Sequence, residues 1–137
     1  MIVVDTSVIV KIVVPEIRSD AAARLRTELL AAPSIWQAEI GNALWRKILT
    51  KEISEAQATP LLRSLFGGVI ATLESDEDNT RDAMKMAVAL EHPIYDCLFL
   101  EAAIRNSTFV VTDDNRFVTA VNRHGQWSGH LRMLSEF

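Results

Sequence analysis

Apolar residues along the chain form short continuous runs and longer segments in which polar residues recur every three or four positions. Short β-branched runs are typical of buried strands, and helical spacing of apolar residues is typical of amphipathic helices. We predict strands at residues 2–5, 34–36, 69–74, 108–113 and 130–134. We predict helices at residues 20–32, 37–51, 54–66, 79–92, 95–106 and 114–125.

The segment 7–14, SVIVKIVV, is ambiguous. Its β-branched residues favour a strand, whereas Thr6 and Ser7 are good helix starters and Pro15 stops the segment. As a helix it would carry apolar residues on every side. We therefore predict that one of its faces meets a second copy of the chain or a partner helix.

The alternation of short strands with helices predicts an α/β fold, with a mostly parallel central sheet covered by helices on both faces. The chain has no Ser/Gly-rich tract, charge block or internal repeat, so we predict a single domain over residues 1–137. Binding sites in such sheets lie at the carboxyl ends of the strands, where the strand order reverses.

Composition limits the class of protein. Of the 137 residues, 49% are apolar, but no apolar run approaches the roughly 20 residues that span a bilayer. We see no secretory signal at the N-terminus, and the single cysteine, Cys97, cannot form an internal disulfide, so we expect a cytoplasmic protein without a membrane partner. The formal net charge of -4 is not that of a protein that holds nucleic acid by bulk charge alone.

Four acids occur at predicted strand ends or helix starts. Asp5 ends the first strand, and Asp114 follows the strand 108–113. Glu39 and Asp96 lie in the first turns of two predicted helices. Each of them could be only a cap or a first-turn acid favoured by the helix dipole. Asp96 is the hardest to explain in this way, because its helix is apolar nearly all round and a buried charge is costly unless paired or bound to a metal.

Metal-assisted attack on a phosphate ester is the chemistry that needs such a group of acids. Mg²⁺ and Mn²⁺ prefer hard oxygen ligands, and bound ions reverse the local sign of charge. A nucleic-acid substrate is therefore compatible with an acidic protein, provided that metal binds first.

Four motifs then resemble one known family. VVDTS with Asp5, AEIGNAL with Glu39, YDCLFLEAA with Asp96 and VTDDNRF with Asp114 resemble the PIN-domain nucleases. Their spacing and the chain length are most similar to VapC-type ribonuclease toxins of bacterial toxin–antitoxin pairs. The resemblance extends from Ile2 to Phe117. Each motif alone is weak, but the four in this order are fairly specific.

The resemblance implies a three-layer α/β/α sandwich and a Mg²⁺- or Mn²⁺-dependent endoribonuclease that cleaves structured RNA. It also implies a homodimer and a cognate antitoxin whose C-terminal segment blocks the acidic groove. By the same resemblance, Asp5, Glu39, Asp96 and Asp114 are the metal-binding catalytic acids. One ion or two could be bound. It also favours a helix at residues 7–14.

Further residues are expected to assist these acids. The supporting residues are Thr6, Asn42, Thr112 and Asp113. Asp113 competes with Asp114 for the fourth acidic position, and we favour Asp114 because it lies two residues past Thr112. Residues within a turn or two of the acids are candidates for contacts with RNA phosphates, and these are Lys11, Arg46 and Arg116.

Three other classes of protein that use a similar sheet lack support in this sequence. A phospho-receiver domain needs an acidic pair after its first strand and a Lys after its fifth, but no Lys follows Lys85. A phosphotransferase with a nucleophilic Asp would carry a second acid at position 7, which is Ser7. A dinucleotide-binding domain would need a G-x-G-x-x-G motif, which is missing. The serious alternative is a non-catalytic copy of the PIN fold that acts as a binding or regulatory module.

Overall fold

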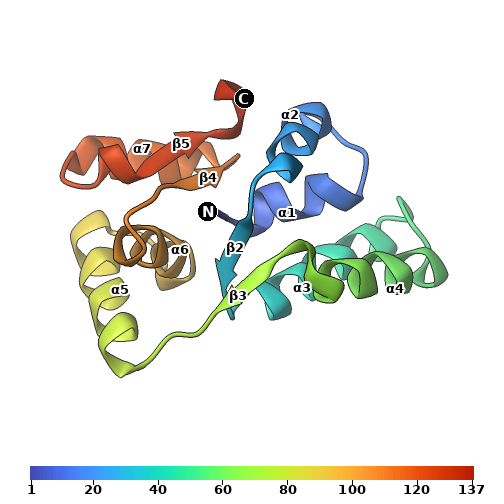
Figure 1. Ribbon diagram of the computed structural model, residues 1–137, viewed down its shortest axis with the longest axis horizontal. Coiled ribbons are helices and arrows are strands. Elements are labelled where there is room, and N and C mark those ends of the chain that lie inside the picture. Colours follow the sequence, from blue (N-terminus) through green and yellow to red (C-terminus); the bar gives the residue numbers. More distant parts are fainter.

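A five-stranded parallel sheet forms the centre of the protein, which is described over residues 1–137 by a computed structural model (Figure 1). The strand order is β3-β2-β1-β4-β5, and every neighbouring pair is parallel. The strands are β1 (Ile2–Val4), β2 (Leu30–Pro33), β3 (Ala71–Leu73), β4 (Val110–Thr112) and β5 (Leu131–Met133). The chain order reverses at β1, which has β2 on one side and β4 on the other.

Seven α-helices form the two outer layers. They are α1 (Thr6–Val13), α2 (Ser19–Arg24), α3 (Trp36–Leu49), α4 (Glu55–Ser64), α5 (Glu77–Leu90), α6 (Ile94–Arg105) and α7 (Asn115–His124). Figure 1 shows α1 to α4 on one side of the sheet and α5, α6 and α7 on the other. The predicted three-layer α/β/α sandwich is confirmed.

The central strands are buried on both faces because helices cover both. Val3 and Val4 in β1 and Val110 and Val111 in β4 are completely inaccessible to solvent. This explains why these strands are continuous β-branched runs without polar alternation. The buried core fixes the ends of β1 and β4, which Asp5, Asp113 and Asp114 directly follow in the chain.

The segment 20–32 does not form the single helix that its Ala and Leu residues predict. The helix α2 ends at Arg24 and a short 3-10 turn follows, after which residues 30–33 form β2. Leu30, Ala31 and Ala32 are buried between β1 and β3. Burial in the sheet thus overrides helix propensity, which is a weak prior of under about 1 kcal/mol per residue. The predicted strand at 34–36 is also wrong, because Trp36 begins α3.

Residues 6–13 form a helix, as the resemblance implied. Val8, Ile9 and Val10 are buried within the chain, where the helix packs against α2 and α3, whereas Ile12 and Val13 are only partly buried. The contact of this helix with a second copy or a partner helix stays a prediction.

Local signals at helix ends are largely confirmed. Ser54 and Gln57 form a capping box at the start of α4, in agreement with the helix predicted from residue 54. Gly68 has a φ of 116° where the chain turns toward β3, a conformation that favours glycine. None of the helices is both long enough and apolar enough to cross a membrane.

Candidate active site

The site lies where β1 and β4 end side by side, at the reversal of strand order. The Asp5 backbone N–H donates to the Val111 carbonyl at 3.1 Å, which carries the parallel pairing to the end of β1. Asp5 then caps α1, since its Oδ1 accepts a hydrogen bond from the Val8 N–H at 3.2 Å. The cap explains why an acid follows this apolar strand, but it uses only one of the two carboxylate oxygens.

Asp5 is almost fully buried, with 3% of its surface exposed. The Ser7 hydroxyl donates to its Oδ1 at 2.5 Å, and the Thr112 hydroxyl donates to its Oδ2. Burial raises the pKa of Asp5 to about 7, although these hydrogen bonds act in the opposite direction. The negative charge of Asp96 raises the pKa further.

Glu39 approaches the same region from the first turn of α3. The Thr6 hydroxyl donates to its Oε1 at 2.9 Å, which ties α3 to the start of α1. Partial burial raises the pKa of Glu39, the Thr6 hydrogen bond lowers it, and the charge of Asp96 raises it again. Glu39 is therefore an acid that water solvates poorly and that faces another carboxylate.

Asp96 comes from the first turn of α6 and is paired with His92. The distance between His92 Nε2 and Asp96 Oδ2 is 2.6 Å. Burial raises the pKa of Asp96, the contact with His92 lowers it, and the charge of Asp114 raises it. Asp96 lies on an otherwise apolar helix, where an unpaired buried charge is costly. His92, four residues earlier and just before α6, is its polar partner.

Asp113 and Asp114 are adjacent in sequence but face different partners. Asp114 caps α7, accepting from the Arg116 N–H at 2.9 Å, and it lines the same cavity as the other three acids. Arg18 donates two hydrogen bonds to the Asp113 carboxylate, from Nε to Oδ1 at 2.6 Å and from Nη2 to Oδ2 at 2.7 Å. Lys11 Nζ lies 3.4 Å from Asp113 Oδ2. Asp114 therefore shares the cavity of Asp5, Glu39 and Asp96, whereas Asp113 belongs to an ion-pair network with Arg18 and Lys11.

A cavity of about 540 Å³ joins the predicted residues. Among the residues that line it are Asp5, Thr6, Glu39, Asn42, Arg46, Asp96 and Asp114. Thr112 lies behind it, buried against Asp5. Lys11 is not at this wall, because its ammonium is held by Glu16 and Asp113. Arg116 lines a neighbouring cleft.

Two residues that contact the acids were not assigned a role from the sequence, namely Ser7 and His92. Ser7 Oγ also accepts a hydrogen bond from the Asp113 N–H at 2.9 Å, so it joins α1 to the end of β4. The spacing of four residues between His92 and Asp96 indicates that they can pair, because residues four apart share a helix face. Pro93 between them obscured it, because it suggested a helix end and not a continuous face.

The oxygen donors suit Mg²⁺ or Mn²⁺, both of which prefer carboxylates and water. No three acidic, histidine or cysteine side chains are close enough together to form a ready-made metal cluster. Mg²⁺ commonly binds through one or two carboxylates and keeps several waters, so a closed protein cage is not required. Poorly solvated acids that raise one another's pKa are what a cation would stabilise.

Comparisons with known proteins agree with this architecture. The PIN domain model matches residues 2–121, and the chain therefore belongs to the PIN domain family, whose members are generally nucleases. No curated protein matches it.

Two solved structures share the fold. PAE2754 from Pyrobaculum aerophilum is 20% identical with a TM-score of 0.73, and the match covers 98% of this chain and 84% of that one. VapC20 from Mycobacterium tuberculosis, described as a sarcin–ricin loop cleaving toxin, is 16% identical with a TM-score of 0.67. That match covers 88% of this chain and 95% of VapC20.

Proposed function

We propose that the protein is a Mg²⁺- or Mn²⁺-dependent endoribonuclease that cleaves structured RNA and acts as the cytoplasmic toxin of a type II toxin–antitoxin pair. The observation that carries the proposal is the convergence of Asp5, Glu39, Asp96 and Asp114, which come from four separate segments and line one cavity. Membership of the PIN domain family supports nuclease activity, and the fold shared with VapC20 supports the comparison with a toxin.

The four acids would hold the ion together with water. Asp5, Glu39 and Asp96 would be the principal acids around the ion, some of them through bound water, and Asp114 would assist with the same ion or with a second one. When bound, a divalent ion lowers the pKa of water and offsets negative charge on a phosphodiester. Thr6 orients Glu39, and the hydroxyls of Ser7 and Thr112 orient Asp5.

Arg46 is the basic residue on the cavity wall, and its guanidinium has no acidic partner. It is placed to contact a phosphate of the bound RNA, because a free guanidinium suits phosphate oxygens. Asn42 lies one turn before it on α3 and offers an amide to the same cavity. No covalent nucleophile is required in this scheme.

Partner binding is the second part of the proposal. Trp45 and Leu49, one turn apart on the outer side of α3, are 55% and 65% exposed. Large exposed apolar side chains tend to mark interfaces. We assign this surface to the antitoxin or to the second subunit of a homodimer. Light scattering of the isolated chain measures the dimer directly.

The test of the activity is cleavage of RNA by purified protein free of antitoxin. We expect cleavage with Mg²⁺, none with EDTA, and none by Asp5→Asn or Asp96→Asn. The matched control is Asp20→Asn, since Asp20 is an exposed acid on α2. Cleavage that survives EDTA or either site substitution would overturn the metal-nuclease proposal.

Calorimetry separates the enzyme from a non-catalytic copy of the fold. Mn²⁺ is titrated into wild type and into Asp96→Asn. An enzyme of the proposed kind binds the ion in wild type and loses binding in the variant. An inert copy shows no binding that depends on the carboxylate.

A further inference from the structure

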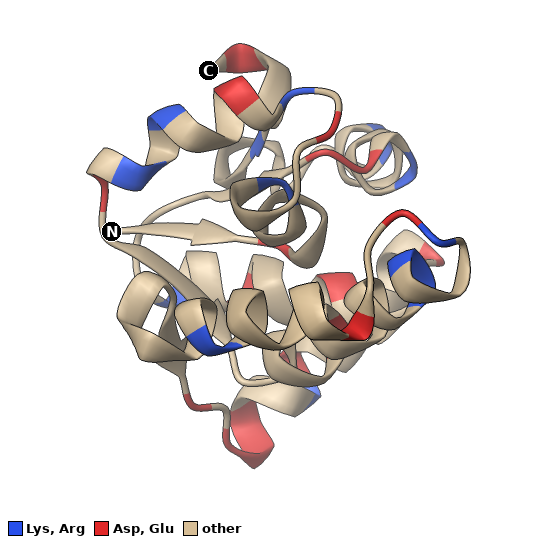
Figure 2. Cartoon of the chain, turned by 90° about the vertical axis from the view of Figure 1, so that its right-hand side faces the viewer, with Lys and Arg blue, Asp and Glu red and all other residues tan.

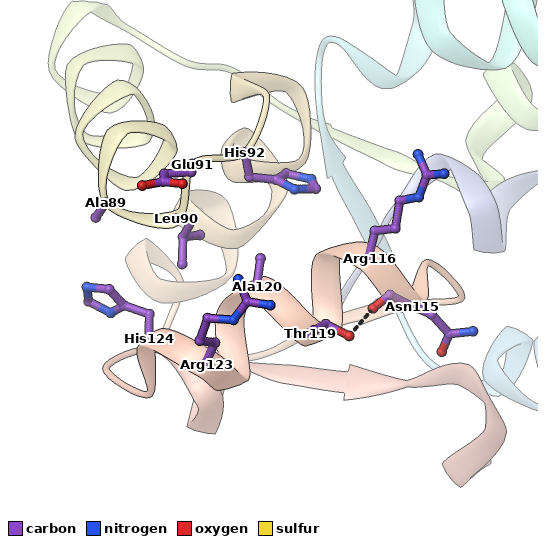
Figure 3. Close-up of a pocket in the computed structure, with 10 residues that line it drawn as sticks. All are labelled: Ala89, Leu90, Glu91, His92, Asn115, Arg116, Thr119, Ala120, Arg123 and His124. Carbon is purple, nitrogen blue, oxygen red and sulfur yellow. Dashed lines mark hydrogen bonds between the residues drawn. The ribbon is translucent and has the colours of Figure 1, made fainter.

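A second concave surface lies beside the acidic cavity, between the end of α5 and the outer side of α7 (Figure 3). We name it the α5–α7 cleft and define it by Leu90, His92, Arg116, Ala120, Arg123 and His124. Its volume is about 680 Å³.

The cleft is basic although the chain as a whole is acidic. Two arginines and two histidines line it, against the single acid Glu91. In the close-up of Figure 3, the Glu91 carboxylate points away from Arg116. Acidic and basic residues are interspersed on the side of the molecule that Figure 2 shows.

The arginines of the cleft are free. Arg18, Arg24, Arg81 and Arg105 each pair with an acid, but the side chains of Arg116 and Arg123 have neither an ion pair nor a hydrogen bond. Both residues are exposed. A guanidinium without a protein partner, on a concave surface, is available to an anionic ligand.

The cleft adjoins the acidic cavity, and residues of the two are in contact. His92 lines the cleft, and its Nε2 contacts Asp96, which lines the cavity. His92 also stacks on Phe117 of α7, with ring centroids 5.1 Å apart. Asp114 lines the cavity and caps the turn of α7 that carries Arg116. The cleft is therefore the concave surface next to the acids on the α7 side.

Arg116 and Arg123 lie seven residues apart on one side of α7, with Thr119 and Ala120 between them. Seven residues of α-helix rise about 10 Å, so the two arginines suit different phosphates of one strand. The side chains at the floor are small. They allow a backbone to approach closely and offer no deep apolar pocket for the anchor residue of a peptide.

We infer that the α5–α7 cleft binds the sugar–phosphate backbone of single-stranded RNA next to the cleaved bond, with Arg116 and Arg123 contacting different phosphates of the strand. This inference deepens the proposed function and rests on it. Phosphate contacts position a nucleic acid without reading its sequence, so the cleft contributes affinity and direction and no base preference.

The test measures the binding of RNA separately from cleavage. A labelled oligouridylate is titrated by fluorescence anisotropy, with Ca²⁺ in place of Mg²⁺, against wild type, Arg123→Gln and Arg63→Gln. Arg63 is the matched control, since it is an exposed arginine without a partner on α4, on the opposite side of the molecule in Figure 1. We expect Arg123→Gln to raise the Kd roughly five- to tenfold and to reduce the salt slope by about 0.7 for one lost phosphate contact.

Cleavage kinetics provide the second readout. Arg123→Gln should raise KM for a long RNA and leave cleavage of a di- or trinucleotide unchanged, because the short substrate does not reach the cleft. If wild type cleaves RNA and Arg123→Gln matches Arg63→Gln in both assays, the cleft inference is wrong and the nuclease proposal stands. If Arg123→Gln weakens binding of a polyglutamate peptide and not of RNA, the cleft is a protein-binding site. If wild type binds no oligouridylate but cleaves structured RNA, the cleft inference is wrong and the nuclease proposal stands. If wild type neither binds nor cleaves any RNA, both fail.

Discussion

The hydroxyl of Thr112 donates a hydrogen bond to Oδ2 of Asp5, although the two residues are 107 positions apart. The same hydroxyl accepts a hydrogen bond from the Asp114 N–H at 3.0 Å. One buried side chain therefore orients two of the four acids, and it does so from the end of β4. The acids belong to a network that joins two parallel strands and the helices that follow them.

Replacing Thr112 by Val keeps the shape of the side chain and removes this hydroxyl. We expect a loss of about 1–3 kcal/mol in the free energy of unfolding, because the Asp114 N–H and one Asp5 oxygen lose their partner. We also expect slower RNA cleavage, because Asp5 is no longer held. Urea denaturation and cleavage assays measure the two effects. Thr59→Val is the control, since its hydroxyl donates only to the exposed Glu55 carbonyl. Equal behaviour of the two variants would contradict the role of Thr112.

Asn substitutions at Asp113 and Asp114 should separate the two neighbouring acids. We expect Asp114→Asn to lower cleavage more strongly than the roughly 10- to 100-fold cost of losing a supporting partner of a metal ligand. Asp113→Asn should instead lower thermal stability, because it weakens the two contacts with Arg18. It also leaves Glu16 as the single acidic partner of Lys11. Cleavage rates and melting temperatures are measured for both. Loss of activity in Asp113→Asn alone would reverse the assignment.

The stability of the metal-free protein should depend on pH through Asp5. Its pKa is raised from 3.8 to about 7 in the folded state, mainly by burial. The folded state therefore holds this proton more tightly than the unfolded state. The stabilisation is fully present below the unfolded pKa and is lost as the pH rises through the folded one. The scale is about 1.4 kcal/mol for each unit of pKa shift.

Asp5→Asn removes this titration. In EDTA, the stability of wild type should fall relative to Asp5→Asn as the pH rises from about 4 to 7, the interval between the two pKa values. Adding Mg²⁺ at the upper end should stabilise wild type more than the variant, because an ion that binds only the folded state adds to its stability. Denaturant titrations at several pH values measure the difference. Parallel curves for the two proteins would show that Asp5 does not titrate in this interval.

His92 should act on metal binding through Asp96. Replacing it by Gln removes the ring nitrogen that lies 2.6 Å from the Asp96 carboxylate. We expect the affinity for Mn²⁺ to fall about tenfold or more, the range seen when a partner of a metal ligand is lost. Calorimetry measures the affinity. His130→Gln is the control, since His130 contacts the Thr108 carbonyl away from the acids. Unchanged affinity in His92→Gln would leave the histidine with a packing role only.

The sequence was most informative where a signal is local. The Ser54–Gln57 capping box, the glycine turn after α4 and the apolar strands β1 and β4 were all predictable, because caps and periodicity involve residues a few positions apart. The four acids were found by their positions at strand ends and helix starts and by the family motifs. The PIN family match over residues 2–121 bears out the resemblance that those motifs carried.

The sequence alone determined the alternation of strands and helices, and hence a parallel sheet with its acids at one edge. Only the tertiary structure decided that Ala31 and Ala32 lie in a central strand, that Asp113 faces Arg18, and that His92 faces Asp96. The physical reason is that these three outcomes depend on which segments become neighbours across the sheet. Burial and pairing between distant residues outweigh local preferences of a fraction of a kcal/mol, and no pattern within a few residues encodes them.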